Sequence, residues 1–172
     1  MRKPIIVING AGGVGKDTLV GFAGEVYRIW NCSTIEPIKD AARLLGWEVS
    51  MKDDKSRKFL SDLKMLSTDY NELPLRYVME KVERFLNCRE HGDILFVHIR
   101  EPHEIKKFVD AVKEKYGRKP ITLLVRRNAV MHQYGNVADD GVEGYEYDYY
   151  FDNNVPLEEA RTAFLRFLKE MA

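Results

Sequence analysis

The sequence has few cysteines, no excess of charge of either sign and no long apolar run. Its two cysteines, Cys32 and Cys88, stand far apart in 172 residues, which excludes a disulfide framework and favours a reducing compartment, the cytoplasm. Lys and Arg total 27, as do Asp and Glu, so the chain has no general surface for nucleic acid. The apolar run near the amino terminus, 5–8, is far shorter than the roughly 20 residues of a membrane span. We therefore expect neither nucleic acid nor a membrane as a partner.

What the chain does contain is enough apolar material for one compact domain, since 45% of its residues are hydrophobic. We expect residues 1–172 to form that single domain. Short β-branched segments alternate with segments of helical periodicity, which predicts a three-layer α/β fold with about five parallel strands and helices on both faces. The expected strands cover 4–8, 33–36, 93–97, 121–125 and 147–151; the expected helices cover about 16–30, three segments within 38–87, then 105–116 and 156–171.

A polar stretch at 126–146 has several Gly and Asn breaks and no sustained period, which predicts an excursion over the fold. Loops of this length often close over a site, so we expect a lid at about 127–146. Tyrosines at 145, 147, 149 and 150 could stack on a base, but tyrosine also suits a pleated sheet, and we favour the structural role.

The most specific motif is G-x-x-x-x-G-K at 10–16, placed between an expected strand and an expected helix. Its glycines let backbone N–H groups point at phosphate oxygens, the helix start adds positive potential, and Lys16 reaches the terminal phosphates. The residues expected to bind the nucleotide are Gly10, Ala11, Gly12, Gly13, Val14, Gly15, Lys16, Asp17 and Thr18. The alternatives are a ligand-free turn and a dinucleotide site, and the pattern of the latter does not call for the lysine.

Asp17 stands where this motif usually has Ser or Thr, and Thr18 follows one place later. A carboxylate is a hard ligand that Mg²⁺ accepts directly or through water, so Asp17 and Thr18 are the expected metal residues. An acid in the first turn also stabilises a helix through its dipole, and this structural role is equally open for Asp17. The expected cofactors are therefore ATP and Mg²⁺.

Together with four later landmarks, this loop resembles that of the nucleoside and deoxynucleoside monophosphate kinases, the adenylate-kinase-like P-loop phosphotransferases. The resemblance runs over nearly the whole chain, and the loop of that group often ends in G-K-D, as here at 15–17. The later landmarks are Ile-Glu-Pro-Ile-Lys-Asp at 35–40, Arg-Lys-Phe-Leu at 57–60, R-x-P-x-E at 100–104, and a Tyr-Asp-Tyr strand before asparagine at 147–154. Only the loop is specific by itself, whereas the others agree in order and spacing.

The resemblance implies an enzyme that transfers the γ-phosphoryl group of ATP to a (deoxy)nucleoside monophosphate, with an acceptor-binding helical region at about 38–89. It implies Lys39, Arg43, Arg57 and Arg100 on the acceptor side, Arg126 or Arg127 at the base of the lid, and a catalytic set of Lys16, Arg100 and Arg126. Arginine suits this role because its planar fork holds two phosphates in line. Each of these cations has a solvated surface position as its alternative.

His98 stands where relatives carry an aspartate that helps to hold magnesium. Three interpretations remain: Asp17 has taken over that role, efficient catalysis has been lost, or an acid near the acceptor, Asp40 or Asp53, acts instead. Two other functions therefore stay open, a kinase for another phosphorylated metabolite and a nucleotide sensor without turnover. The sequence leaves open whether the protein is a monomer or a homodimer.

A zinc site is not favoured, although cysteine and histidine crowd one stretch of the chain. Its ligands would be Cys88, His91, His98 and His103. Their spacing matches no standard finger or ribbon.

Overall fold

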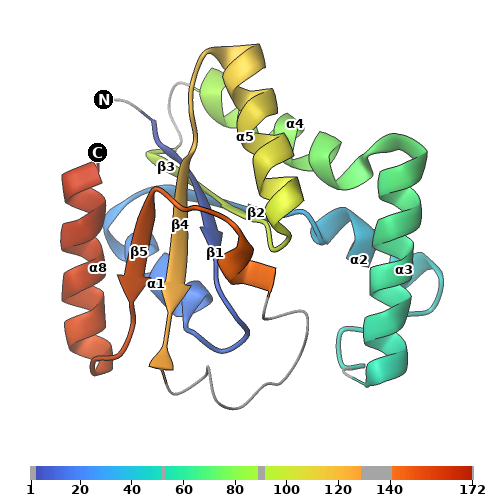
Figure 1. Cartoon of the computed structure of the whole chain (residues 1–172), viewed down its shortest axis with the longest axis horizontal. Helices are drawn as coiled ribbons and strands as arrows, with labels where there is room; N and C mark the ends of the chain where they lie inside the picture. Colours follow the sequence, from blue (N-terminus) through green and yellow to red (C-terminus); the bar gives the residue numbers. More distant parts are fainter. Residues whose placement is uncertain (1–2, 52, 89–91, 129–140, 172) are drawn as a thin grey trace.

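The computed structural model describes residues 3–51, 53–88, 92–128 and 141–171, and its centre is a five-stranded parallel sheet (Figure 1). The strand order is β2-β3-β1-β4-β5, and every strand pair is parallel. The strands are β1 Ile5–Asn9, β2 Ile29–Ser33, β3 Ile94–His98, β4 Ile121–Arg126 and β5 Tyr149–Asp152. The helices are α1 Lys16–Val26, α2 Glu36–Leu44, α3 Asp54–Asn71, α4 Leu73–Asn87, α5 Pro102–Tyr116, the 3₁₀ turn η1 Gly141–Gly144, and α8 Leu157–Met171.

Helices cover both faces of the sheet, because successive residues of the central strands point to opposite sides. On one face, Val7 and Leu95 pack against α4 and α5. On the other, Ile8 and Phe96 pack against α1 and α8, where Phe164 is fully buried. The prediction of a three-layer α/β fold with about five parallel strands is therefore confirmed.

The second strand lies four residues earlier than the sequence predicted. Helix α1 ends at Val26, Tyr27 adopts an extended backbone, and β2 runs over Ile29–Ser33 rather than 33–36. Glu36, placed in the strand from sequence, instead begins α2, where Pro37 occupies the first turn. Proline favours that position because it has no N–H for the helix to satisfy. Pro37 was thus the available signal for the helix start.

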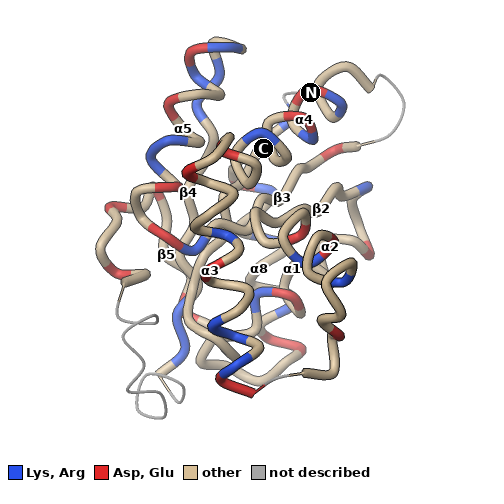
Figure 2. Tube along the Cα trace, turned by 90° about the vertical axis from the view of Figure 1, so that its right-hand side faces the viewer, with Lys and Arg blue, Asp and Glu red and all other residues tan. Residues whose placement is uncertain are grey.

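Helices α2 and α3 extend from the β2 edge of the sheet and form an arm at the right of Figure 1, which α4 connects back to the core. This agrees with the prediction of a helix, a loop and two further helices within 38–87. Basic and acidic residues are interspersed along the chain in this region (Figure 2). None of the helices in the described ranges is long and apolar enough to cross a membrane.

Candidate nucleotide-binding site

The loop between β1 and α1 has a backbone that only glycine adopts readily at three positions. Gly10, Gly13 and Gly15 have φ angles of 146°, 80° and 94°. A Cβ atom on Gly10 would lie 2.4 Å from the Val125 carbonyl oxygen, and one on Gly15 would lie 2.6 Å from Asn153 Nδ2. The neighbouring chain therefore requires glycine at the first and last turns of the loop.

The start of α1 is prepared for an anion. Its N-cap is Gly15, which supplies no side-chain hydrogen bond to the first N–H groups of the helix. Above the loop, the Lys16 ammonium donates to the carbonyl oxygens of Gly10 and, at 2.9 Å, Ala11. Gly12 and Gly13 are exposed at the mouth. A curled backbone, an uncapped helix start and a nearby ammonium together fit the phosphates of a nucleotide.

A buried asparagine fixes the entrance to the loop, and its role was not anticipated from the sequence. Asn9 Oδ1 accepts from the Gly10 N–H at 2.8 Å. Asn9 Nδ2 donates to the Arg100 carbonyl at 2.9 Å and to the Tyr147 hydroxyl at 2.8 Å. The signal in the sequence was a polar residue that ends an otherwise apolar strand.

A second buried asparagine holds the far side of the loop. Asn153, which follows β5, donates through Nδ2 to the Val14 carbonyl at 2.8 Å. Its own N–H donates to the Arg126 carbonyl at 2.8 Å. Hydrogen bonds therefore join the loop to the ends of β4 and β5, and Asn153, the asparagine after the tyrosine-rich strand, makes them.

Asp17 and Thr18, the expected metal residues, lie exposed in the first turn of α1. Within the described ranges, no group of three or more His, Cys, Asp or Glu side chains could hold a metal ion. Magnesium is commonly held by one or two protein ligands, with substrate phosphates and water completing the octahedron. The two residues fit such a partial set of ligands.

His98 ends β3 beside the loop, with Nε2 2.8 Å from Asn31 Oδ1 on β2. An amide oxygen only accepts, so this contact assigns the proton to Nε2. Burial lowers the pKa of His98, and the Lys16 ammonium acts in the same direction against the opposing carboxylates of Asp17 and Glu36. At neutral pH His98 is therefore an uncharged imidazole.

Of the expected acceptor-side cations, Arg100 is the one whose backbone contacts the loop, through the hydrogen bond from Asn9. Its side chain is exposed. Lys39 is half-buried on α2. Arg43 pairs with Asp40 one turn earlier on the same helix.

The two remaining acceptor-side candidates lie at the start of α3. Arg57 is 3.6 Å from Asp54 in an exposed pair within the first turn. Asp53 caps this helix by accepting from the Ser56 N–H at 2.7 Å, and that hydrogen bond lowers its pKa. Asp53 thus has a structural role at the helix start.

At the base of the expected lid, the Arg126 guanidinium binds both oxygens of Glu143. The distances are 3.0 Å from Nε to Oε1 and 2.6 Å from Nη2 to Oε2. The same guanidinium lies 4.3 Å from the centre of the Tyr150 ring. Arg127 is exposed, and residues 129–140 of the expected lid lie outside the described ranges.

No family model matches the chain, and no curated protein matches it. Solved structures with a similar fold include the tunicamycin resistance protein of Deinococcus radiodurans, at 14% identity and a TM-score of 0.59, covering 97% of this chain and 96% of that one. A sugar kinase from Janibacter sp. gives 15% identity, a TM-score of 0.53 and coverages of 98% and 95%. Shikimate kinase from Aquifex aeolicus gives 11% identity, a TM-score of 0.52 and 96% coverage of both chains.

At these identities the similarity concerns the fold. The strand order, the loop and these neighbours define the chain as a protein with the P-loop NTPase fold. Two of the neighbours named above are a sugar kinase and a shikimate kinase.

Proposed function

We propose that this protein is an ATP-dependent kinase that transfers the γ-phosphoryl group to a (deoxy)nucleoside monophosphate. The observation that carries the proposal is the loop at 10–16, with its left-handed glycines, its uncapped helix start and the Lys16 ammonium above it. Arg126 ends β4 and Arg100 follows β3, and these two strands flank β1, which leads into the loop. A second phosphate would lie near these two arginines. Two anionic reactants need cations on both sides.

The proposal gives each of these residues a role. The loop amides and Lys16 bind the donor phosphates, while Arg100 and Arg57 hold the acceptor and Arg126 assists from the base of the lid. Asp17 and Thr18 would hold Mg²⁺, which when bound neutralises charge on the phosphates. No general base is required, because a phosphate acceptor is already ionised at neutral pH and positioning with electrostatics carries the rate.

We expect Lys16→Ala to lower kcat/KM by about a hundredfold or more, the usual effect of removing one preorganised charge partner. The measurement is a coupled assay with ATP and magnesium against a panel of ribo- and deoxynucleoside monophosphates. Lys113→Ala, an exposed change on α5, is the matched control and should keep wild-type turnover. If none of the nucleoside monophosphates is phosphorylated although ATP still binds, the proposal of a nucleotide acceptor is contradicted.

A second candidate is a kinase whose acceptor is another phosphorylated small metabolite. The observation in its favour is that neighbours of similar fold carry the names sugar kinase and shikimate kinase. A thermal-shift screen distinguishes the two candidates. Stabilisation by such a metabolite and not by nucleoside monophosphates would support the second one.

The neutral His98 favours a third candidate, a nucleotide sensor without turnover. Under the kinase proposal, Asp17 supplies the carboxylate, so we expect His98→Asp to change kcat by no more than about tenfold, the scale of one hydrogen bond. The coupled assay measures this change. If the wild-type protein has almost no phosphotransfer activity and His98→Asp raises it, the result would instead support the sensor.

We also propose that the protein works in the cytoplasm on small-molecule nucleotides, without nucleic acid or membrane, as a monomer or homodimer. Equal numbers of basic and acidic residues and the free thiols of Cys32 and Cys88 support this. The single domain, the acceptor-binding region at about 38–89 and the lid at about 127–146 belong to the same proposal.

A further inference from the structure

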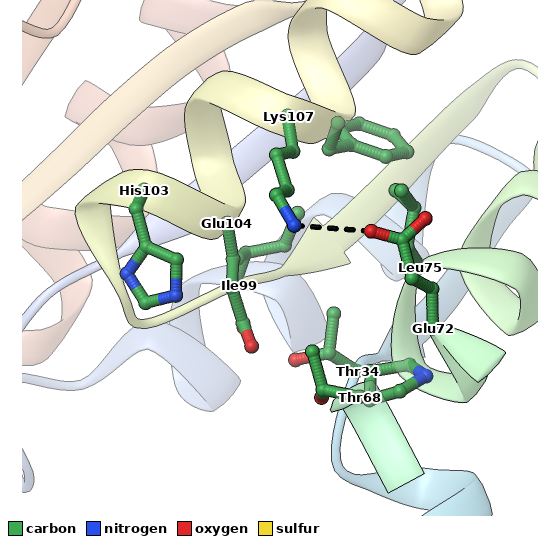
Figure 3. A pocket seen from close by; sticks show the side chains of 10 residues that line it. Thr34, Thr68, Glu72, Leu75, Ile99, His103, Glu104 and Lys107 are labelled. Carbon is green, nitrogen blue, oxygen red and sulfur yellow. Dashed lines mark hydrogen bonds and ion pairs between the residues drawn. The ribbon is translucent and has the colours of Figure 1, made fainter. Parts of the chain in front are cut away.

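A second feature is an open cleft where residues of α3 and α4 face α5 (Figure 3). Leu75, Ile99 and Phe108 give it an apolar wall. Thr34, Thr68 and Glu104 give it a polar end. A mostly apolar hollow with a few convergent polar groups is the usual form of a small-molecule site.

The cleft opens at the carboxyl edge of the sheet, the edge from which the phosphate-binding loop also leaves. Ser33 pairs with His98 across β2 and β3, so Thr34 and Ile99 follow these strands at the same edge of the sheet. Arg100 comes next in the chain, and its carbonyl is bound by Asn9, the residue that also holds the first amide of the loop. The carboxyl edge of a parallel sheet is where ligands of α/β proteins bind. A molecule could therefore place a phosphate at Arg100 and the rest of itself in the cleft.

Above about pH 7, where the Glu104 carboxyl is ionised, the polar end of the cleft has more carboxylate than cation. Lys64, from α3, binds Glu101 at 2.6 Å and Glu104 at 2.7 Å, so one ammonium serves two carboxyl groups. The side chains of Lys64 and Glu104 are only 12% and 14% exposed, which limits the help that water gives them. Lys107 and Glu72 neutralise each other across the cleft at 3.0 Å.

The Glu104 side chain turns toward the space beside Thr34 and Thr68, and away from the apolar wall (Figure 3). The Thr68 hydroxyl already donates to the Lys64 carbonyl at 2.8 Å, so toward the cleft its oxygen can only accept. The Thr68 oxygen and the ionised Glu104 carboxylate are therefore two acceptors at this end of the cleft.

We propose that the cleft binds the base of the acceptor nucleotide, and that Glu104 selects bases presenting an exocyclic amino group. The proposal rests on the proposed function, because it places the acceptor beside the phosphate-binding loop. Guanine, adenine and cytosine offer an amino group that a carboxylate accepts from. Thymine and uracil offer one ring N–H between two carbonyl oxygens, which a carboxylate repels. The apolar wall of Leu75, Ile99 and Phe108 packs against the ring.

The test combines direct binding with turnover at about pH 8, where the Glu104 carboxyl is ionised. Dissociation constants and KM values are measured for the monophosphates of guanosine, adenosine, cytidine, thymidine and uridine. We expect the wild type to favour the amino-bearing bases by about tenfold or more, the effect of one charge-assisted hydrogen bond. Glu104→Gln should bring the two groups within about threefold, because an amide donates as well as accepts.

Two further variants keep the result interpretable. Glu104→Asp retains the charge, so the preference should keep its direction even if affinity falls. Asp110→Asn makes the same chemical change in an exposed ion pair with Lys106 on the same helix, and should alter nothing. The affinity for a non-hydrolysable ATP analogue, measured in each variant, shows that the phosphate-binding loop is intact.

The outcomes separate the two proposals. Equal binding of all five nucleotides, or a preference that survives in Glu104→Gln, overturns the cleft inference while ATP-dependent turnover still supports the kinase. Selective binding that Glu104→Gln abolishes, without any phosphotransfer, supports the cleft and overturns the kinase. If no nucleoside monophosphate binds, both are overturned.

Discussion

At the scale of single residues, the two buried asparagines give the phosphate-binding loop its shape before any ligand arrives. Asn9 joins the loop to the Arg100 carbonyl and the Tyr147 hydroxyl, and Asn153 joins it to the end of β5. A buried amide left without a partner costs about 1–3 kcal/mol, so these contacts hold one arrangement against alternatives. The loop therefore does not need the nucleotide in order to adopt its curl.

Arg126 forms an ion pair with Glu143, and this ion pair predicts a measurable effect on nucleotide affinity. The guanidinium must release that carboxylate before it can reach a phosphate. Both side chains are partly exposed, so the pair contributes no more than about 1 kcal/mol. We expect Glu143→Gln to tighten binding of a non-hydrolysable ATP analogue by up to about fivefold, measured by calorimetry.

The matched control for that prediction is the double change of Glu143→Gln with Arg126→Ala. If the gain passes through Arg126, the double variant should bind no better than Arg126→Ala alone. A gain that persists there would mean that Glu143 acts on the nucleotide by another route.

At the scale of elements, sequence patterns identified those whose signal is local. Strands β1, β3 and β4 are nearly continuous apolar runs buried on both faces, and a periodicity count finds them within a residue or two. Strand β2 lies at an edge and mixes the exposed Asn31 with the buried Cys32, which left its boundaries open to error. The motif at 10–16 predicted the loop. The contacts from Asn9 and from Lys64 could not be predicted, because they join segments that only the folded chain brings together.

The bridge from α3 to the start of α5 predicts a stability that depends on pH. Burial raises the pKa of Glu104 to about 7, and the hydrogen bond that its protonated carboxyl donates to Glu101 adds to the effect against the Lys64 ammonium. Burial opposes ionisation of Glu101 too, but the hydrogen bond from Glu104 and the ammonium lower its pKa overall. The pair shares a proton that an unfolded chain would lose above about pH 4.5.

Between about pH 5 and 8 the folded protein therefore releases this proton, and the unfolded chain has already released its own. Stability contributed by Glu104 is present at pH 5 and is lost as the pH rises through 7. We expect the melting temperature of Glu104→Gln, relative to wild type, to rise by about 2–4 °C from pH 5 to pH 8, the change that about 1 kcal/mol produces. Calorimetry measures it, with Asp110→Asn as the control. A constant difference would show that the carboxyl titrates normally.

At the scale of the whole molecule, the two substrate regions are built from different parts of the chain. The donor loop belongs to the core, held between β1, β4 and β5. The proposed acceptor cleft lies between the core and the arm of α2 and α3, where Lys64 of α3 binds Glu101 and Glu104 at the start of α5. Under the proposed function, we expect a change in the arm to alter which acceptor binds and to leave the binding of ATP unchanged.

The central place of β1 has a consequence for how the protein folds. Ile5 pairs with Leu95 and Ile6 pairs with Ile121, so β1 pairs with β3 and β4, two strands that lie much later in the chain. Closing such long loops costs entropy before any contact repays it, and sheets of high contact order fold slowly. The glycine loop precedes β4 in the chain, so it gains its walls only once β4 has paired with β1, and its phosphate-binding shape forms late in folding.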